Sequence, residues 1–375
     1  MFSLLTLALT GSPAKAGLVG FARLGAFGVL ALFGGVVADR FDRKRVMVTA
    51  DTARGAALAL LAASLLAGRP AFAAIVAVAV VEGAGEAFFR PASAGATRSV
   101  VPPRQLPAAS STTQARLATV RLVGPPIGGA LFGIGRAVPF VVDALSYVCS
   151  LVTVLLMRTP FQEARDATPA RVVAELRDGL RFLWAQRFLR AIGLLFMVTN
   201  IVAAGVMLTV IVAGREQGLS GRAIGAVVAV LGAASLVGSL ASPLVRRALT
   251  PRRILLFELW TWVGTGLFVL VPDVYILAAA IVPCGFAIPN SDATIGSYAL
   301  AIPPDRLVGR VQSALVTFAL AAGPLGTVGT GVLLEALGAR TTIAALAALA
   351  LVLAIVGTLS PALRAAPKLG DLDAA

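Results

Sequence analysis

Hydrophobic residues form long runs along most of the chain, and short polar or charged segments separate these runs. Five runs contain no charged residue and cover residues 191–214, 223–245, 274–291, 311–334 and 341–363. A helix needs about 20 apolar residues to cross the hydrocarbon core of a bilayer. The pattern therefore predicts a transmembrane helix in each run, all of them in the second half of the chain.

Six further runs carry isolated charges but keep the length of a membrane span. They cover residues 17–38, 46–67, 71–89, 107–133, 138–157 and 254–272. A helical stub at residues 1–10 reaches only about 15 Å, which is half of the hydrocarbon thickness. We interpret the stub as the end of a first helix whose beginning is missing. The prediction is an all-α membrane protein on a twelve-helix plan with an incomplete first helix.

A polar stretch divides the predicted spans into two groups. We predict a helix bundle at 1–157, a cytoplasmic linker at 158–190, a second bundle at 191–363 and a cytoplasmic tail at 364–375. Thr168 and Pro169 are typical of a helix start, and the apolar residues after them predict an amphipathic helix on the cytoplasmic surface. Residues 12–19 (SPAKAGLV) match residues 220–227 (SGRAIGAV), which indicates two pseudo-symmetric six-helix bundles from one duplicated unit.

The composition excludes several classes of protein. Of the 375 residues, 58% are hydrophobic and 13% are charged, whereas soluble proteins carry about 25% charged residues, so a soluble enzyme is excluded. The chain has no histidine, and its two cysteines lie in apolar runs. We therefore predict no metal site, no disulfide framework and no cofactor. The sequence also lacks the G-x-x-x-x-G-K-[ST] phosphate loop of a primary ATPase.

The basic residues predict the orientation in the membrane. The net charge of +14 is spread among apolar runs rather than gathered in a soluble domain, so we predict no nucleic-acid partner. If the loop at 39–45 is cytoplasmic, alternating spans place most of the 32 lysines and arginines on the cytoplasmic side. We predict a multi-pass protein of the cytoplasmic membrane, monomeric, with a cytoplasmic C-terminus.

A charged loop, GGVVADRFDRKR at residues 34–45, follows the first full span. It resembles the G-x-x-x-D-R-x-G-R-K loop of the major facilitator superfamily, with the motif positions taken by Gly35, Asp39, Arg40, Arg43 and Lys44. Such a loop suits a gating latch, because glycine permits close helix approach and the carboxylate can cap a facing helix. Asp42 replaces the second glycine of the family motif, so we expect a different turn there.

The fifth span contains Gly124, Pro125, Pro126, Ile127, Gly128 and Gly129. This sequence is similar to the G-P-x-x-G-G motif that the superfamily carries in its exporters. Proline bends the helix, and Gly124 and Gly128 are predicted to form a contact surface of small residues. Ordinary close packing of helices is the alternative explanation.

Three further segments, at residues 88–92, 309–313 and 333–340, resemble the drug and siderophore exporter branch of this superfamily, which includes macrolide-efflux proteins. The resemblance implies twelve helices in two bundles and alternating access through a central cavity. It also implies proton antiport, with protons as the coupling ion and a small amphipathic molecule as cargo. An importer and a transport-inactive membrane sensor remain as alternatives, whereas no charged ring or pore loop supports a channel.

Ionisable residues at membrane depth are costly and are therefore candidates for function. Glu82, Glu86 and Arg90 are spaced four apart and share one helix face. Glu82 lies near the middle of its span, and Arg116 in the fifth span reaches a similar depth. We predict that Glu82, with Glu86, alternates between an ion pair with Arg116 or Arg121 and a protonated state. A permanent structural ion pair is the alternative.

Four other carboxylates lie within apolar runs, namely Asp51, Asp143, Glu258 and Asp292. Asp51 and Glu258 are about 6–8 Å inside the cytoplasmic boundary, where interfacial solvation suffices, so we predict structural roles for them. The same prediction applies to the other two. Arg54, one turn after Asp51, is predicted to support the charged loop.

Overall fold

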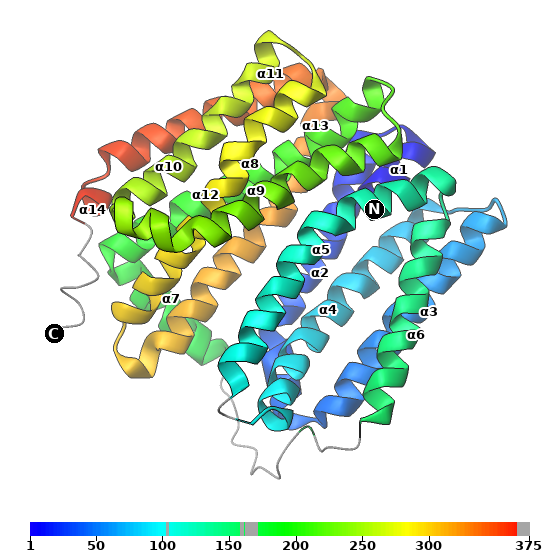
Figure 1. The fold of residues 1–375 in the computed structure, drawn as a ribbon, viewed down its shortest axis with the longest axis horizontal. Helices are drawn as coiled ribbons and strands as arrows, with labels where there is room; N and C mark the ends of the chain where they lie inside the picture. The colour runs from blue at the N-terminus through cyan, green and yellow to red at the C-terminus, as the bar shows by residue number, and fades with distance from the viewer. Residues whose placement is uncertain (103–104, 158–160, 162–171, 366–375) are drawn as a thin grey trace.

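The computed structural model describes residues 1–102, 105–157, 161 and 172–365, and its regular secondary structure is helical throughout these residues (Figure 1). This confirms the predicted all-α fold. The principal helices are α1 (Phe2–Thr10), α2 (Pro13–Arg40), α3 (Arg43–Leu66), α4 (Phe72–Val100), α5 (Leu106–Ile134), α6 (Val138–Leu156), α7 (Val172–Ala185), α8 (Arg187–Glu216), α9 (Gly221–Ala248), α10 (Pro251–Val263), α11 (Leu267–Leu270), α12 (Val274–Ala301), α13 (Asp305–Leu359) and α14 (Pro361–Arg364).

Each predicted span corresponds to a helix, but α4 and α12 continue beyond the predicted ends at residues 89 and 291, to Val100 and Ala301. The long element α13 holds two of the predicted spans, because Gly338 interrupts it at φ 74°, a conformation that glycine adopts without strain. Segments 305–337 and 339–359 are therefore separate helices. Among the described residues, nine helices are long and apolar enough to cross a membrane, and α5 adds the shorter apolar segment Leu122–Ile134.

The two matching segments of the sequence begin equivalent helices. The Ser12 hydroxyl accepts a hydrogen bond from the Lys15 backbone N–H at the start of α2, at 3.2 Å. The Ser220 hydroxyl accepts one from the Ala223 backbone N–H at the start of α9, also at 3.2 Å. Such caps satisfy backbone donors that the first helical turn leaves unpaired.

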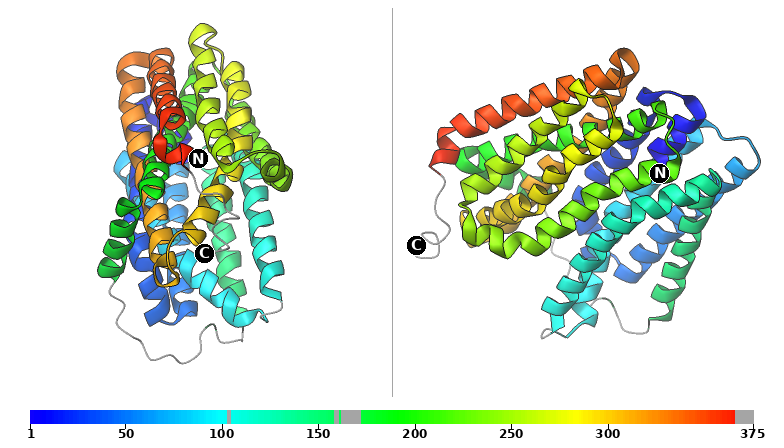
Figure 2. Two further views of the ribbon diagram at one scale, coloured as in Figure 1. Left: turned by 90° about the vertical axis from the view of Figure 1, so that its left-hand side faces the viewer. Right: turned by 45° about the horizontal axis from the view of Figure 1, so that its top comes forward.

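The turns between helices gather at two ends of the molecule (Figures 1 and 2). One end, which we call the basic end because arginines flank its turns, contains residues 41–42, 249–250 and 302–304. The opposite end contains the turns at residues 11–12, 135–137 and 217–220 and the break at Gly338. Helix α7 lies at the basic end.

Helix α7 is the amphipathic helix expected in the linker. Its predicted start at Thr168 and Pro169 lies outside the described residues. The helix packs on α13. Leu183 is fully buried there, and Asp178 Oδ2 lies 2.7 Å from Arg310 Nη1. This contact fixes the end of the linker to the second group of helices.

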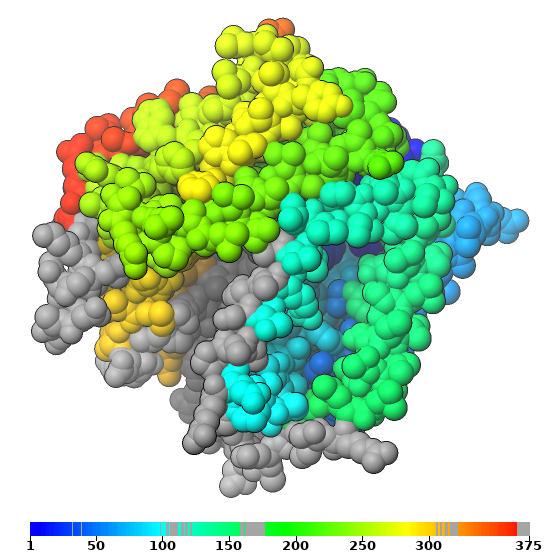
Figure 3. Space-filling view, in the orientation of Figure 1, coloured from blue at the N-terminus to red at the C-terminus, as the bar shows by residue number. Residues whose placement is uncertain are grey.

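Two pairs of helices join the group α1–α6 to the group α8–α14. Helix α2 packs along α13, and α5 packs along α9. Figure 3 shows the surfaces of α5 and α9 in contact near the opposite end. In Figure 1 the two groups diverge from this region toward the basic end. The arrangement is that of two bundles joined at one end.

Candidate functional site

Two carboxylates of α4 lie at the centre of a network of charged side chains. Glu82 Oε2 lies 3.1 Å from Arg54 Nη2 of α3. Glu86 Oε2 lies 2.8 Å from Arg23 Nη2 of α2, and its Oε1 lies 3.9 Å from Arg90 Nη1. The network therefore ties α2 and α3 to α4 through alternating charges.

Tyr147 of α6 completes the surroundings of Glu82. Its hydroxyl donates to Glu82 Oε2 at 3.3 Å, and the Arg54 guanidinium lies 4.5 Å from the centre of its ring. Only 5% of the Glu82 side chain and 13% of the Arg54 side chain are exposed. Glu82 Oε1 is buried and has no hydrogen-bond partner among the described residues. A carboxylate in such surroundings depends on its cation, and its unpaired oxygen is a position where a proton can bind.

Two glycines between the carboxylates allow this arrangement. A Cβ atom at Gly83 would lie 2.0 Å from the Arg23 carbonyl oxygen, so only glycine lets α2 approach α4 here. A Cβ atom at Gly85 would lie 2.4 Å from Arg54 Cδ. The sequence EGAGE at residues 82–86 thus supplies both the acids and the space for their partners.

The partners of Glu82 differ from those that we predicted. Arg54 does not support the charged loop but pairs with Glu82. Arg116 is exposed on α5 and forms no ion pair with the carboxylates that the structure describes, and the side chain of Arg121 lies outside the described part. Helical periodicity places both acids on one face of α4. It does not indicate whether α3 or α5 lies against that face.

The turn between α2 and α3 shows why Asp42 replaces a glycine. Asp42 is the N-cap of α3, and its Oδ1 accepts a hydrogen bond from the Arg45 backbone N–H at 2.8 Å. Lys44 Nζ donates to the carbonyl oxygens of Leu155 and Met157 at the end of α6. The turn therefore needs no left-handed residue, because a capping carboxylate takes the place of the flexible glycine.

The other residues of this motif have different surroundings. Arg43 donates from Nε to the Ala38 carbonyl oxygen at 3.2 Å and lies against Gly95 of α4. Arg40 is exposed, and the side chain of Asp39 lies outside the described part. The close helix contact occurs at Gly34, where a Cβ atom would lie 2.2 Å from the Ala87 carbonyl oxygen, whereas Gly35 faces open space. The predicted contact is therefore one residue away from Gly35 in this conformation.

The G-P-x-x-G-G segment of α5 lies at the contact with α9. A Cβ atom at Gly129 would lie 2.3 Å from the Gly221 carbonyl oxygen, and one at Gly225 would lie 2.4 Å from the Pro125 carbonyl oxygen. The surface that we predicted, Gly124 with Gly128, is not this contact. Gly124 is exposed, and Gly128 lies against the Met1 side chain.

Helices α2 and α13 form the equivalent contact at the same end of the molecule. A Cβ atom at Gly17 would lie 2.4 Å from the Thr327 carbonyl oxygen. Glu335 of α13 accepts hydrogen bonds from the Ala14 backbone N–H, at 3.0 Å, and from the Ser12 hydroxyl. A carboxylate of one bundle thus caps the first turn of a helix in the other.

A cavity of about 300 Å³ lies between α8, α12 and α13 in the half of the second bundle near the basic end. Phe196 and Met197 contribute apolar surface, Asn200 contributes an amide, and Asp292 contributes a carboxylate. This volume and mixture of groups suit a small ligand with an apolar body and one polar or cationic group. Sequence reasoning placed Asp292 at membrane depth but not in a cavity wall, because the pattern does not show which helices surround it.

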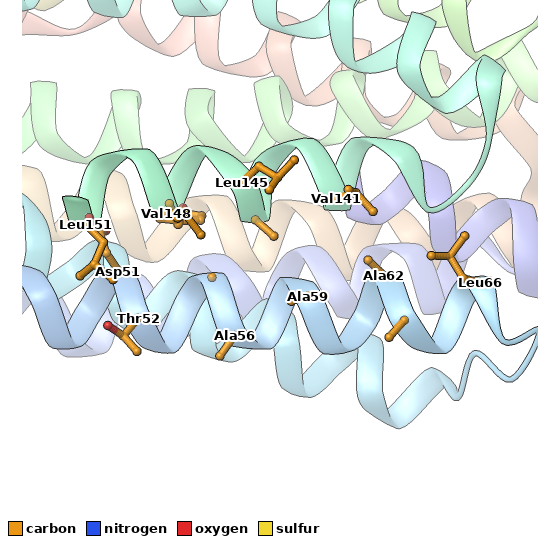
Figure 4. A pocket seen from close by; sticks show the side chains of 14 residues that line it. Asp51, Thr52, Ala56, Ala59, Ala62, Leu66, Val141, Leu145, Val148 and Leu151 are labelled. Atoms are coloured by element: carbon orange, nitrogen blue, oxygen red, sulfur yellow. The ribbon is translucent and has the colours of Figure 1, made fainter. Parts of the chain in front are cut away.

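A second concave surface, of about 500 Å³, is a groove between α3 and α6 (Figure 4). Small side chains of α3, such as Ala56 and Ala59, face larger ones of α6, such as Leu145 and Val148. Its polar lining residues are Thr52, Tyr147 and Asp51, and Asp51 Oδ2 accepts a hydrogen bond from the Ser150 hydroxyl at 2.7 Å. Its other lining residues are apolar, and Tyr147 also belongs to the charged network through its hydrogen bond to Glu82.

The comparisons with known proteins agree with this architecture. The family model of the Major Facilitator Superfamily matches residues 1–259, so the chain belongs to this superfamily and is a multi-pass membrane transporter. The resemblance seen in the sequence is confirmed.

Among curated relatives, the multidrug efflux pump Tap of Mycolicibacterium fortuitum is 28% identical over 390 residues, which cover 97% of this chain and 91% of the relative. Macrolide efflux protein A of Streptococcus pyogenes is 28% identical over 200 residues, covering 50% of this chain and 49% of the relative.

Solved transporter structures share the fold. A bacterial homolog of the human lysosomal transporter Spinster, in an inward-facing and unoccupied conformation, superposes with a TM-score of 0.76 at 15% identity, covering 97% of this chain and 93% of that one. The nucleoside transporter NupG gives a TM-score of 0.72 at 14% identity, with 97% and 94% covered. At these identities the likeness concerns the fold alone.

Proposed function

We propose that the protein is a monomeric secondary active exporter in the cytoplasmic membrane that expels small amphipathic molecules in exchange for protons. The cavity beside Asp292 and the relatives described as multidrug and macrolide efflux pumps support this proposal. The chain acts as a transporter and not as an enzyme. Its domains are the bundles 1–157 and 191–363, joined by the linker 158–190 and followed by the tail 364–375.

The orientation follows from the distribution of charge. Arginines and lysines concentrate at the basic end, so this end is cytoplasmic and the C-terminus lies on the same side. The close contacts of α2 with α13 and of α5 with α9 then lie on the outer side. In this conformation the transporter is closed outside, and cargo reaches the cavity from the cytoplasm.

The buried ion pair of Glu82 with Arg54 is the observation that carries the proposal. A proton that binds Glu82 neutralises the carboxylate and weakens its attraction to Arg54, which loosens the link between α3 and α4. Release of the proton restores the ion pair. The pair of Glu86 with Arg23 links α4 to α2 in the same way, and α2 packs along α13, so protonation acts on a helix that joins the two bundles.

The test is efflux of a panel of amphipathic dyes and macrolides from an efflux-deficient bacterium, with and without a protonophore. The unmodified protein lowers accumulation, and the protonophore abolishes this effect. Glu82→Gln raises accumulation to the level of the empty vector, because the amide cannot exchange a proton. Glu216→Gln, which alters an exposed carboxylate at the end of α8, leaves efflux unchanged.

Other outcomes distinguish the alternatives. Higher accumulation of one compound in cells that express the protein would establish an importer. Binding of compounds by the purified protein without any flux would establish a sensor. Protonophore-sensitive efflux that persists in Glu82→Gln would refute the role of Glu82 and leave the structural ion pair as its explanation.

A further inference from the structure

A carboxyl group in the second bundle has no cation paired with it among the residues that the structure describes. Glu258 of α10 is 4% exposed, and its Oε2 is buried without a hydrogen-bond partner among the described residues. The interfacial solvation that the sequence predicts for this residue is therefore wrong. Helix α10 packs against α12 and α13.

The polar and titratable groups around Glu258 come from α10 itself and from α12. The Ser291 hydroxyl of α12 and the Trp262 indole, one turn along α10, are its polar neighbours. Its titratable neighbours are Asp292 and Cys284, both on α12. The facing segments of α8, α9 and α13, residues 191–214, 223–245 and 341–359, contain no charged residue. Arg252, at the start of α10, donates to the Thr358 carbonyl oxygen instead.

Without a cation, the neutral form of this carboxyl is favoured, because a buried carboxylate that is neither paired nor fully hydrogen-bonded carries a large desolvation cost. We propose that Glu258 is a proton-binding site of the second bundle, and that its proton is coupled across α12 to the charge on Asp292 in the cavity wall.

The coupling follows from helix geometry. Ser291 and Asp292 are successive residues of α12, so their side chains point about 100° apart around the helix. Ser291 is fully buried toward α10, whereas Asp292 is exposed and lines the cavity. A negative charge on Asp292 opposes ionisation of Glu258, and a cationic cargo beside Asp292 removes that opposition. Binding of the cargo would then favour release of the proton, which is the exchange that antiport needs. Only this last step rests on the proposed function.

The fluorescence of Trp262 reports protonation of Glu258 directly, because Trp262 lies beside Glu258 and is 1% exposed. The chain has three tryptophans, so Trp184→Phe with Trp260→Phe leaves Trp262 as the sole tryptophan. We expect its fluorescence in the purified, detergent-solubilised protein to change with pH in a single step. Glu258→Gln removes the step, and Asp292→Asn moves its midpoint to lower pH, because one opposing charge is gone.

Control measurements separate the loss of the fluorescence step from misfolding and from loss of transport. Each variant is checked for helical circular dichroism and for a single peak in size-exclusion chromatography. Glu82→Gln, which alters the carboxyl of the first bundle, leaves the step in place. A step that survives in Glu258→Gln, or no step in a folded protein that has Trp262 and Glu258, would overturn the inference. Absence of efflux with the step intact would instead refute the proposed function.

Discussion

At the scale of single residues, the Arg54–Glu82 pair is shielded from solvent, so removal of one partner differs in cost from removal of both. Arg54→Met leaves a buried carboxylate without its cation, and we expect it to lower the free energy of unfolding by about 3–5 kcal/mol at alkaline pH. Arg54→Met combined with Glu82→Gln removes both charges and recovers most of this loss. Chemical unfolding followed by circular dichroism measures both variants.

The exposed Arg90 supplies the matched control for this double-mutant cycle. Its side chain is 60% exposed and lies 3.9 Å from Glu86, so Arg90→Met should change the stability by less than about 1 kcal/mol. If the double variant were as unstable as Arg54→Met alone, the two charges would not be coupled and the pair would carry no role in the proposed exchange.

The residues of this site were predictable only in part from the sequence. The spacing of four between Glu82 and Glu86 predicts a shared helix face, and in the structure their arginine partners come from two different helices, α3 and α2. The identity of these partners was not predictable, because periodicity describes one helix and not its neighbours. The same limit explains why the tight contact lies at Gly34 rather than at Gly35.

At the scale of helices, the contact of α5 with α9 depends on the absence of a side chain at Gly129. Gly129→Ala brings a methyl group against the Gly221 carbonyl oxygen, so we expect the outer contact to loosen. Phe132 is buried there, and Phe132→Cys labelled with a membrane-impermeant maleimide measures the opening. Gly133→Ala, one turn away with open space around it, leaves the labelling low. Equal labelling in both variants would argue against a gate here.

The cap that Glu335 provides to α2 is a second contact that holds the two bundles together at the end opposite the basic end. Glu335→Ala removes the acceptor of the Ala14 backbone N–H, a type of contact worth about 0.5–2 kcal/mol. We expect more frequent opening and therefore faster maleimide labelling of Phe132→Cys, by about twofold to thirtyfold when that energy is converted to an equilibrium ratio. Glu216→Ala serves as the control, and an unchanged rate in Glu335→Ala would show that the cap does not hold the closed state.

Helix positions were the most predictable level of this structure. Long apolar runs predict spans reliably, because a backbone within the bilayer must satisfy its own hydrogen bonds as a helix. The two spans within α13 were predicted separately, because Glu335 and Arg340 interrupt the apolar pattern, but the sequence did not indicate that Gly338 alone would separate segments 305–337 and 339–359. The matching serines at positions 12 and 220 predicted repeated units, and both cap a helix.

At the scale of the whole molecule, one face of α2 carries two glycines at which contact with the other bundle can alternate. Gly17 touches α13 at the end opposite the basic end, and Gly35 lies 18 residues later, which is five helical turns, so both glycines share one face. Gly17 is in contact and Gly35 faces open space. A rocking motion that separates the outer contact would bring the Gly35 end of this face toward the other bundle, as alternating access requires.

This motion predicts opposite changes at the two ends of α2. Gly35→Cys, with Cys149 replaced by serine because it is exposed, should react rapidly with a maleimide in the resting protein. Gly17→Leu cannot fit against the Thr327 carbonyl oxygen, so it favours the outward-open state and should slow the reaction at residue 35 while accelerating it at Phe132→Cys. Leu156→Cys, at a position that is 74% exposed at the basic end of α6, should react equally in both backgrounds. Faster labelling at both residue 35 and residue 132 would indicate that the bundles separate rather than rock.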